Sequence, residues 1–216
     1  MKNMNNESGR SMIEMLGVLA IIGVLSVGGI AGYSKAMMQY KINKTADQVS
    51  QIVSNVRTLF GSQKSYVGLY CESTSDTGCQ IVKKAHLVPD EMWSTDGTII
   101  ENAFGGKVIL SVGTKKVNTD TKAFGIDLYS VPEEACMALA TYDWGSGSSS
   151  GLIALSVNAG TVAAITGTLV GCTGSTAAGK AIACPNGSTV SIPMPVNVAA
   201  TACASSDSNT ISLKFY

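Results

Sequence analysis

The longest apolar stretch of the sequence lies close to its N-terminus. Residues Met15–Tyr33 read MLGVLAIIGVLSVGGIAGY, a stretch that has no charge and a single serine, Ser26. A helix of about 20 such residues spans the roughly 30 Å hydrocarbon core of a bilayer. Three interpretations fit this pattern: a secretory signal peptide, a permanent membrane anchor, or an anchor that is clipped in front of the apolar stretch and later packs against other helices.

Apolar residues continue beyond this stretch, but they now recur at every third or fourth position. Polar residues fill most of the other positions, so the pattern predicts an amphipathic helix, with Gly61 well placed to end it. The whole predicted helix runs from Ser11 to about Phe60 and would be roughly 75 Å long at 1.5 Å per residue. The apolar positions of its second half are Ala46, Val49, Ile52, Val53, Val56, Leu59 and Phe60.

The rest of the chain has shorter patterned segments separated by Gly, Asn and Ser, which is typical of a globular head containing strands. A helix is predicted from Ser130 to Thr141, because Ser130 can cap it, Glu133 follows three residues later and Pro132 falls in the first turn. Residues 145–150, rich in Gly and Ser, are expected to form a flexible loop. The predicted strands are Lys107–Val112, Ala123–Tyr129, Leu152–Val157, Thr161–Thr166 and Ile211–Tyr216.

The composition argues against several classes of function. Lys and Arg together number 15, Asp and Glu also number 15, and only 14% of the 216 residues are charged, against roughly 25% in an average soluble domain. A neutral chain without a basic cluster gives no indication of nucleic-acid binding. The sequence has no phosphate-binding loop, catalytic-triad spacing or metal-ligand cluster, and its single histidine, His86, is expected on the surface. We therefore expect no enzyme, cofactor or metal, and we expect five acids to be solvated: Asp120, Asp127, Glu133, Glu134 and Asp143.

A short motif stands directly before the apolar stretch. Gly9 is followed by Arg10, and Glu14 is the fifth residue after that glycine. This spacing, together with the uncharged stretch behind it, resembles the processing site of type IV prepilins and of the related type II secretion pseudopilins. The resemblance covers about the first 50 residues and implies cleavage between Gly9 and Arg10, with N-methylation at Arg10. Among the departures from the family's pattern, the residue after the cut is usually apolar, whereas here it is Arg10.

The resemblance also implies how the chain would act. Glu14 of an incoming subunit would pair with the N-terminal amine of its neighbour, an attraction that a low dielectric strengthens. The implied partners are identical subunits in a homopolymer, prepilin peptidase, an assembly platform with its motor and, before assembly, the inner membrane. The chain would first cross that membrane once, with its head in the periplasm, and would end in an extracellular pilus filament.

The fold that the resemblance implies is α+β, with a long N-terminal helix packed on a disulfide-stapled head that contains an antiparallel sheet. The expected parts are a cleaved leader (1–9), the N-terminal helix (10–61) and the globular head (62–216). The expected function is that of a structural subunit of a type IV pilus, serving adhesion, aggregation, motility or DNA transfer. Two alternatives stay open: a pseudopilin of a type II secretion system or a minor pilin, and, more distantly, a membrane-anchored periplasmic binding protein or enzyme.

The six cysteines all lie in the head, and they suggest three disulfides formed in an oxidising compartment. The absence of a C-x-x-C motif and the single histidine argue against a zinc site. Six cysteines allow 15 connectivities, and the sequence does not choose among them. The resemblance to type IVb pilins implies a long bridge, Cys136–Cys203, and we expect two local loops beside it, Cys71–Cys79 and Cys172–Cys184.

Overall fold

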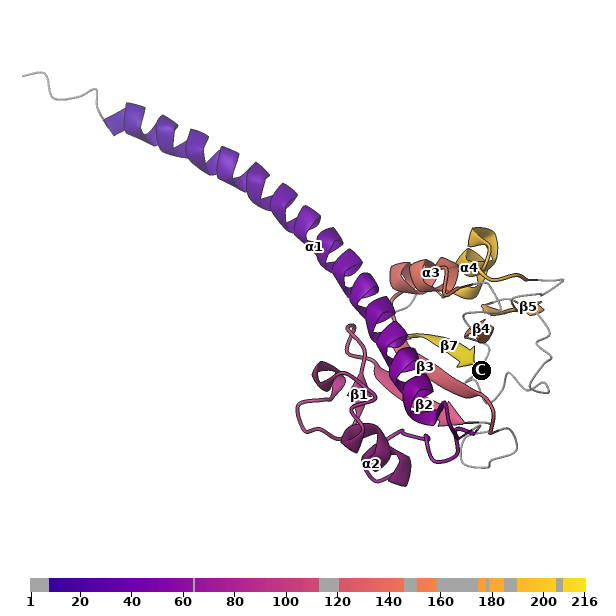
Figure 1. Ribbon diagram of the computed structural model, residues 1–216. Helices are drawn as coiled ribbons and strands as arrows, with labels where there is room; N and C mark the ends of the chain where they lie inside the picture. The colour runs from indigo at the N-terminus through magenta and orange to yellow at the C-terminus, as the bar shows by residue number, and fades with distance from the viewer. Residues whose placement is uncertain are drawn as a thin grey trace, which may run out of the picture. The chain divides into compact units, whose positions relative to one another are not determined.

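The computed structural model describes residues 8–63, 65–112, 121–145, 151–158, 175–177, 179–184, 190–204 and 208–216. The chain divides into two compact units, Met1–Tyr40 and Lys41–Tyr216. The helix α1 (Ser8–Phe60) begins in the first unit and ends in the second (Figure 1). It ends directly before Gly61, as the sequence predicts, and a Cβ atom at that position would lie 2.8 Å from the carbonyl oxygen of Arg57.

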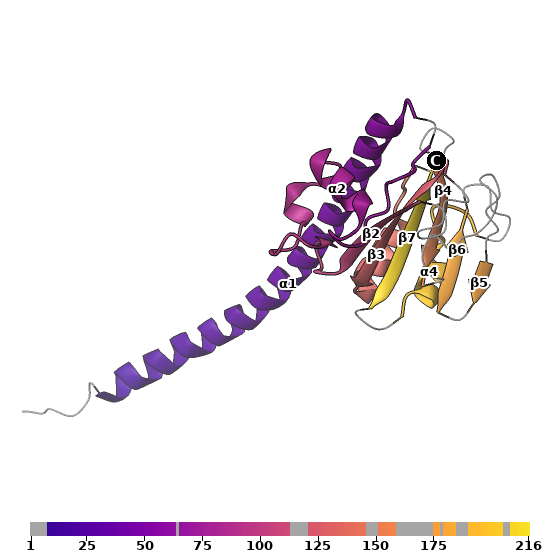
Figure 2. The same cartoon turned by 90° about the horizontal axis from the view of Figure 1, so that it is seen from below.

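The second unit is built on one seven-stranded sheet in the order β1-β2-β3-β7-β4-β6-β5, and all neighbouring pairs are antiparallel. Figure 2 shows β2, β3, β7, β4, β6 and β5 side by side in this order. Together with the long helix, this sheet confirms the predicted α+β fold. The strands are β1 (Ile100–Glu101), β2 (Lys107–Val112), β3 (Phe124–Val131), β4 (Leu152–Val157), β5 (Ser175–Ala177), β6 (Lys180–Ala183) and β7 (Asn209–Phe215).

Shorter helices complete this unit. The helix α2 (Thr77–Lys84) and the 3₁₀ helix η1 (Asp90–Met92) lie in the connection between α1 and the sheet. The helix α3 (Glu133–Thr141) follows β3, and α4 (Val196–Ala202) precedes β7. Because α3 packs against α4 and against β7, these two helices form a pair beside the central strands.

The second half of α1 packs on one face of the sheet. Its core-facing side chains, such as Val49 and Ile52, are fully buried. A row of aromatic rings joins the end of the helix to the central strands: Phe60 lies 5.6 Å from Tyr66, Tyr66 lies 4.8 Å from Phe124, and Phe124 lies 5.6 Å from Phe215. Phe124 and Phe215 are paired in register across β3 and β7, so both project from the same face.

The opposite face of the central strands carries a buried polar row. Asp127 of β3 pairs with Ser212 of β7, which pairs in turn with Ser156 of β4, and each of the three is at most 1% exposed. The prediction of a solvated Asp127 is therefore wrong, because β3 is buried on both faces from Phe124 to Leu128. Three of the other acids, Glu133, Glu134 and Asp143, are exposed as predicted, and Asp120 lies outside the described residues.

The boundaries of two predicted elements, the helix after β3 and the last strand, need correction. Ser130 does not cap α3: it belongs to β3 with a φ of 54°, and the N-cap of the helix is Pro132, which has no side-chain cap. The strand simply continues through the residues that the capping pattern assigns to the helix start. The strand predicted at Ile211–Tyr216 begins two residues earlier, at Asn209, and the one predicted at Thr161–Thr166 lies outside the described residues.

Candidate functional site

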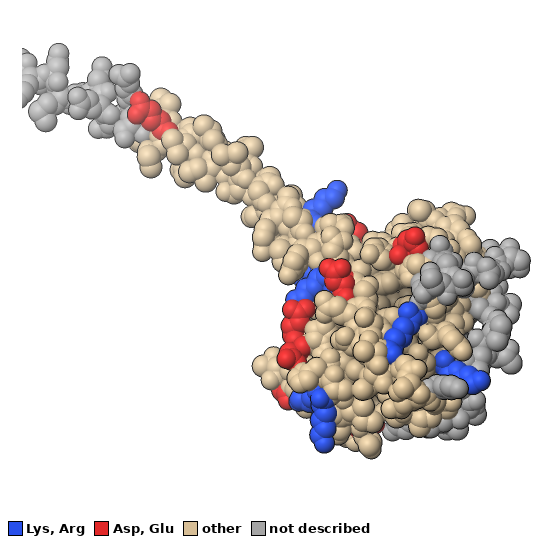
Figure 3. Space-filling view, viewed as in Figure 1, with Lys and Arg blue, Asp and Glu red and all other residues tan. Residues whose placement is uncertain are grey.

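The first half of α1 exposes an unusual amount of apolar surface. Twelve large aliphatic side chains between Met12 and Ile30 are each 52–75% exposed. An 18-residue window of this helix has a mean hydropathy of 2.2 and no buried residue, so its length and composition suffice to cross a membrane. Figure 3 shows this part of the helix almost free of charged residues. Covering these side chains would stabilise the protein by on the order of 15 kcal/mol, so this surface requires lipid or other helices around it.

The predicted processing residues lie at the start of the same helix. Gly9 and Arg10 fall within its first three residues, and Glu14 follows about one turn later. Between residues 12 and 40 the only charged residues are Glu14 and Lys35. Glu14 therefore stands directly before a stretch that carries no charge until Lys35. In a membrane, an acid beside such a stretch is costly unless it has a partner.

Polar contacts fix the second half of α1 to the connection that carries η1. The amide nitrogen of Gln48 donates to Glu91 at 2.8 Å, and the ammonium of Lys44 lies 3.1 Å from the same carboxylate. The hydrogen bond from Gln48, and after it the contact with Lys44, holds the pKa of Glu91 below its ordinary value of 4.5. Further along, Asn55 donates to the carbonyl oxygen of Leu87 at 3.2 Å. His86, beside this contact, is exposed as predicted and lies 3.5 Å from Asp90.

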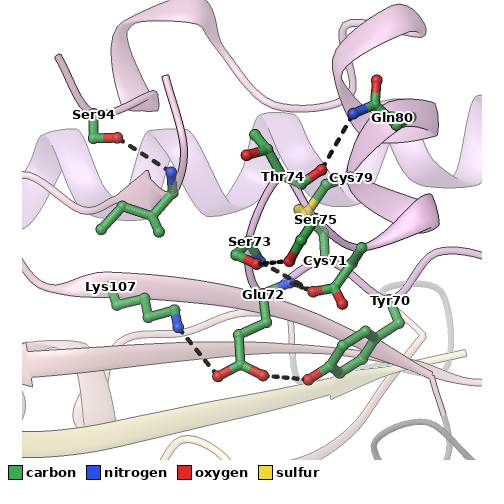
Figure 4. Close-up of a disulfide and its surroundings, with 12 residues drawn as sticks. Tyr70, Cys71, Glu72, Ser73, Thr74, Ser75, Cys79, Gln80, Ser94 and Lys107 are labelled. Atoms are coloured by element: carbon green, nitrogen blue, oxygen red, sulfur yellow. Dashed lines mark hydrogen bonds and ion pairs between the residues drawn. A yellow bond between two sulfur atoms is a disulfide. The ribbon is translucent and has the colours of Figure 1, made fainter. Parts of the chain in front are cut away.

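The disulfide Cys71–Cys79 closes a loop that ends in α2 and lies against β2 (Figure 4). Backbone hydrogen bonds of 2.9 and 3.0 Å join Cys71 to Leu110 of β2. Next to it, Glu72 accepts a hydrogen bond from the Tyr70 hydroxyl at 2.5 Å and pairs with Lys107 at 3.1 Å. Burial, followed by this hydrogen bond, raises the pKa of Tyr70. The loop is therefore held to the sheet by a backbone bridge and by side chains, in addition to the sulfur bridge.

The second disulfide, Cys136–Cys203, joins α3 to the residue that follows α4, with the two Cα atoms 5.9 Å apart. The structure thus brings together two of the three expected pairs, and no described cysteine is free. Cys184 is also disulfide-bonded. Its expected partner, Cys172, lies outside the described residues, so the pair Cys172–Cys184 stays a prediction.

Two asparagines near the long disulfide form a clasp that the sequence reasoning missed. The amide of Asn209 donates to the carbonyl oxygens of Val131 and Ala204, both at 3.1 Å, and its oxygen accepts the N–H of Ala204 at 2.7 Å. Asn158 donates to the same oxygen and to Ala202, both at 2.8 Å. One buried amide thereby joins the ends of β3, β4 and α4 to the start of β7. A polar residue opening an apolar strand was the available signal.

Comparisons with known proteins agree on one family. A family model described as PilS N terminal matches residues 39–215. The major structural subunit of the bundle-forming pilus from Escherichia coli O127:H6 is 32% identical over 146 residues, covering 67% of this chain and 69% of that protein. The chain belongs to the type IV pilins. The same subunit from Escherichia coli O111:H- matches this pilin with the same identity and coverage.

A solved structure supports the fold of this pilin. TcpA, a type IV pilin from the El Tor biotype of Vibrio cholerae, superposes with a TM-score of 0.53 and 15% sequence identity, over 82% of this chain and 99% of that one. The family identifies the pilin as a structural protein without enzymatic activity, as the composition predicts. The surface that matters for its function is therefore a surface of assembly, and the exposed half of α1 is the largest apolar one described.

Proposed function

We propose that this pilin is made as a precursor, cut by prepilin peptidase between Gly9 and Arg10, and polymerised through α1 into a type IV pilus. The proposal treats residues 1–9 as the leader, 10–61 as the helix and 62–216 as the head. The observation that carries it is the juxtaposition of Glu14 with twelve exposed aliphatic side chains in one helix. Such a surface is stable in lipid before assembly and against identical helices after it.

Glu14 is the proposed recognition residue within this surface. Cleavage after Gly9 gives Arg10 a free ammonium group, and in a packed bundle of helices its natural partner is the carboxylate of a neighbouring subunit. The pairing matters because an uncompensated charge costs on the order of 2.5–3.5 kcal/mol in the centre of a bilayer, and less near its edge, where Glu14 would lie. A subunit whose Glu14 meets the amine of its neighbour avoids that cost, whereas a subunit placed out of register does not.

The proposed localisation follows from the same sequence of events. The precursor crosses the inner membrane once with its head in the periplasm, and the filament lies outside the cell. The energy for extraction comes from a cytoplasmic motor acting through an assembly platform, since the sequence carries no phosphate-binding loop. The name of the Escherichia coli relative supports a role as the major subunit of a pilus, and adhesion and aggregation are the proposed outputs.

A substitution of Glu14 tests the assembly role. We expect Glu14→Gln to be processed normally, as judged by loss of the nine-residue leader on immunoblots, and to yield at most about a tenth of the filaments recovered by shearing. The matched control is Glu133→Gln, which removes an exposed carboxylate from the first turn of α3 and should leave the filament yield unchanged. A normal filament yield from Glu14→Gln would show that assembly does not need the pairing of Glu14 with the amine of a neighbouring subunit.

Deletion of prepilin peptidase tests the processing step independently. The leader should persist in that strain and should be absent from the parent. If the leader is cut in both strains, the chain is processed as an ordinary exported protein. Electron microscopy of the sheared fraction then separates a major pilin, which forms abundant long filaments, from a pseudopilin or minor pilin, which does not.

A further inference from the structure

Two charges bracket the apolar part of α1 at a spacing that matches the thickness of a bilayer. Glu14 and Lys35 stand 21 positions apart in the helix, and no other charge lies between residues 12 and 40. At 1.5 Å per residue this separation is about 31 Å, close to the roughly 30 Å of a hydrocarbon core. A precursor that crosses the membrane with Glu14 at one face of this core therefore carries Lys35 at the headgroups of the other face.

The side chain of Lys35 is exposed, and its charge has no partner in the described part of the chain. Its ammonium forms no hydrogen bond or ion pair with any residue that the structure describes. An acid of the same helix could reach it from three or four positions away, but the nearest acid in the sequence is Asp47, 12 positions later. The positions within that reach hold Ala31, Gly32, Met38 and Gln39. The ammonium is therefore available to an anion from outside the chain.

Two tyrosines indicate that this part of the helix lies at a membrane surface. Tyr33 and Tyr40 are 67% and 58% exposed, and their spacing of seven residues places them on one face of the helix. A phenol has an apolar ring and a polar hydroxyl, so tyrosines are enriched where hydrocarbon meets headgroups. Because helical side chains lean toward the N-terminus, the ring of Tyr40 leans back toward the level of Lys35. Exposed aromatic rings and a cation thus occupy the two turns that follow the apolar stretch.

An identical helix is a poor partner for this ammonium. The apolar half of a second α1 contains a single acid, Glu14, and the proposed assembly pairs that acid with an N-terminal amine. Within one membrane, moreover, Glu14 of a neighbouring precursor lies at the opposite face. A phospholipid presents its phosphate at the level of Lys35, and an ammonium donates charge-assisted hydrogen bonds to phosphate. An anionic lipid is the better partner, because its headgroup has no cation of its own to compensate the phosphate.

We propose that Lys35 binds the phosphate of an anionic phospholipid, such as phosphatidylglycerol, in the membrane leaflet on the side of the head. This inference rests on the proposed membrane-spanning precursor and adds a lipid partner to it. A basic residue near an anionic membrane surface contributes about 1 kcal/mol, which corresponds to about a fivefold preference. The contact also gives the precursor a preferred depth, because a shift of α1 along its axis takes Lys35 either into hydrocarbon or away from the phosphates.

Native mass spectrometry of the full chain measures this preference. The chain is released from detergent micelles doped with equal amounts of phosphatidylglycerol and phosphatidylcholine, and the bound fractions of the two lipids are compared. We expect the wild type to prefer phosphatidylglycerol and Lys35→Gln to lower that preference by about fivefold. Lys35→Arg keeps the charge and should keep most of the preference. The matched control Lys180→Gln, which removes an exposed lysine from β6, should bind both lipids like the wild type.

A further variant and a membrane assay make the result specific. Lys41→Gln removes the next cation along the helix and should retain more of the preference than Lys35→Gln does. The lipid site is overturned if Lys35→Gln keeps the wild-type preference, or if Lys41→Gln or Lys180→Gln loses as much as Lys35→Gln. Alkaline carbonate extraction of vesicles tests the membrane-spanning precursor separately, because both the wild type and Lys35→Gln should stay in the membrane pellet. A wild-type chain that carbonate removes would overturn the spanning precursor and, with it, this site.

Discussion

The two described disulfides should contribute unequally to stability, because they close loops of very different length. Cys136 and Cys203 are 67 residues apart, whereas Cys71 and Cys79 are 8 apart. In the chain-entropy treatment, the first bridge stabilises the fold by about 4 kcal/mol and the second by about 2.5 kcal/mol. All four sulfur-bearing side chains are at most 5% exposed, so replacing either pair by alanine incurs a similar packing loss. The difference of about 1.5–2 kcal/mol between the two variants therefore comes from the difference in loop length.

Urea unfolding of the full chain in detergent micelles measures this difference. The variants are Cys136→Ala with Cys203→Ala, and Cys71→Ala with Cys79→Ala, followed by tryptophan fluorescence. With a slope of about 2 kcal/mol per molar urea, the midpoint of the long-bridge variant should fall by about 0.7–1 M more than that of the short-bridge variant. A short-bridge variant that loses as much as the long-bridge variant would refute the reasoning. It would show that the contacts of the Cys71–Cys79 loop with β2 depend on the sulfur bridge.

Two further substitutions test contacts in the head by the same urea assay. Asn209→Ala should lower the free energy of unfolding by about 3 kcal/mol, because it leaves the buried carbonyl oxygen of Val131 in β3 without this partner and removes the hydrogen bonds to the backbone of Ala204, just after α4. The exposed control Asn197→Ala should change it by less than about 0.5 kcal/mol, and equal losses would contradict the clasp. Glu91→Gln should cost about 0.5 kcal/mol at pH 7, the usual contribution of an exposed pair. Since the folded state holds the pKa of Glu91 below 4.5, this contribution is complete above pH 4.5 and is lost as the pH falls through the folded-state pKa. The difference from the wild type should therefore shrink as the pH is lowered below 4.5, and a constant difference would argue against an ionic contribution.

The sequence predicts the long helix and the central strands because each has a pattern of its own. The apolar stretch, the three-to-four spacing and Gly61 together define α1, and β2 and β4 match their predicted bounds. These elements depend on local periodicity, which is visible in the sequence itself. The disulfide pairs, in contrast, depend on which segments meet in space, and for the long bridge only the resemblance to type IVb pilins supplied that information.

The missed elements are those whose stability comes from tertiary contacts. The helix α2 has only 8 residues and contains Gly78, where a side chain would overlap the carbonyl oxygen of Tyr70, so close packing rather than helix propensity determines that residue. The strands β5 and β6 consist mainly of small residues without alternation. In β3, alternation along a strand predicts that Ile126 faces the core and Asp127 faces solvent. Both are buried, because this strand is covered on both faces.

Glu14, in contrast, could be identified from the sequence alone. Its interpretation depends on its distance to Gly9 and on the uncharged residues behind it, and both can be read directly from the sequence.

The distribution of charge suggests that cohesion and specificity lie in different parts of this pilin. Removal of residues 1–9 would take one lysine and one glutamate, leaving 14 residues of each sign and a neutral subunit. Neutral subunits can stack in large numbers without accumulating repulsion, so the apolar half of α1 can supply most of the cohesion at any filament length. Apolar packing alone has little preference for register, because any shift of one such helix along another still covers aliphatic surface. In the proposed filament, a single carboxylate at Glu14 would supply the missing register, since one alignment would bring it to the N-terminal amine of a neighbouring subunit.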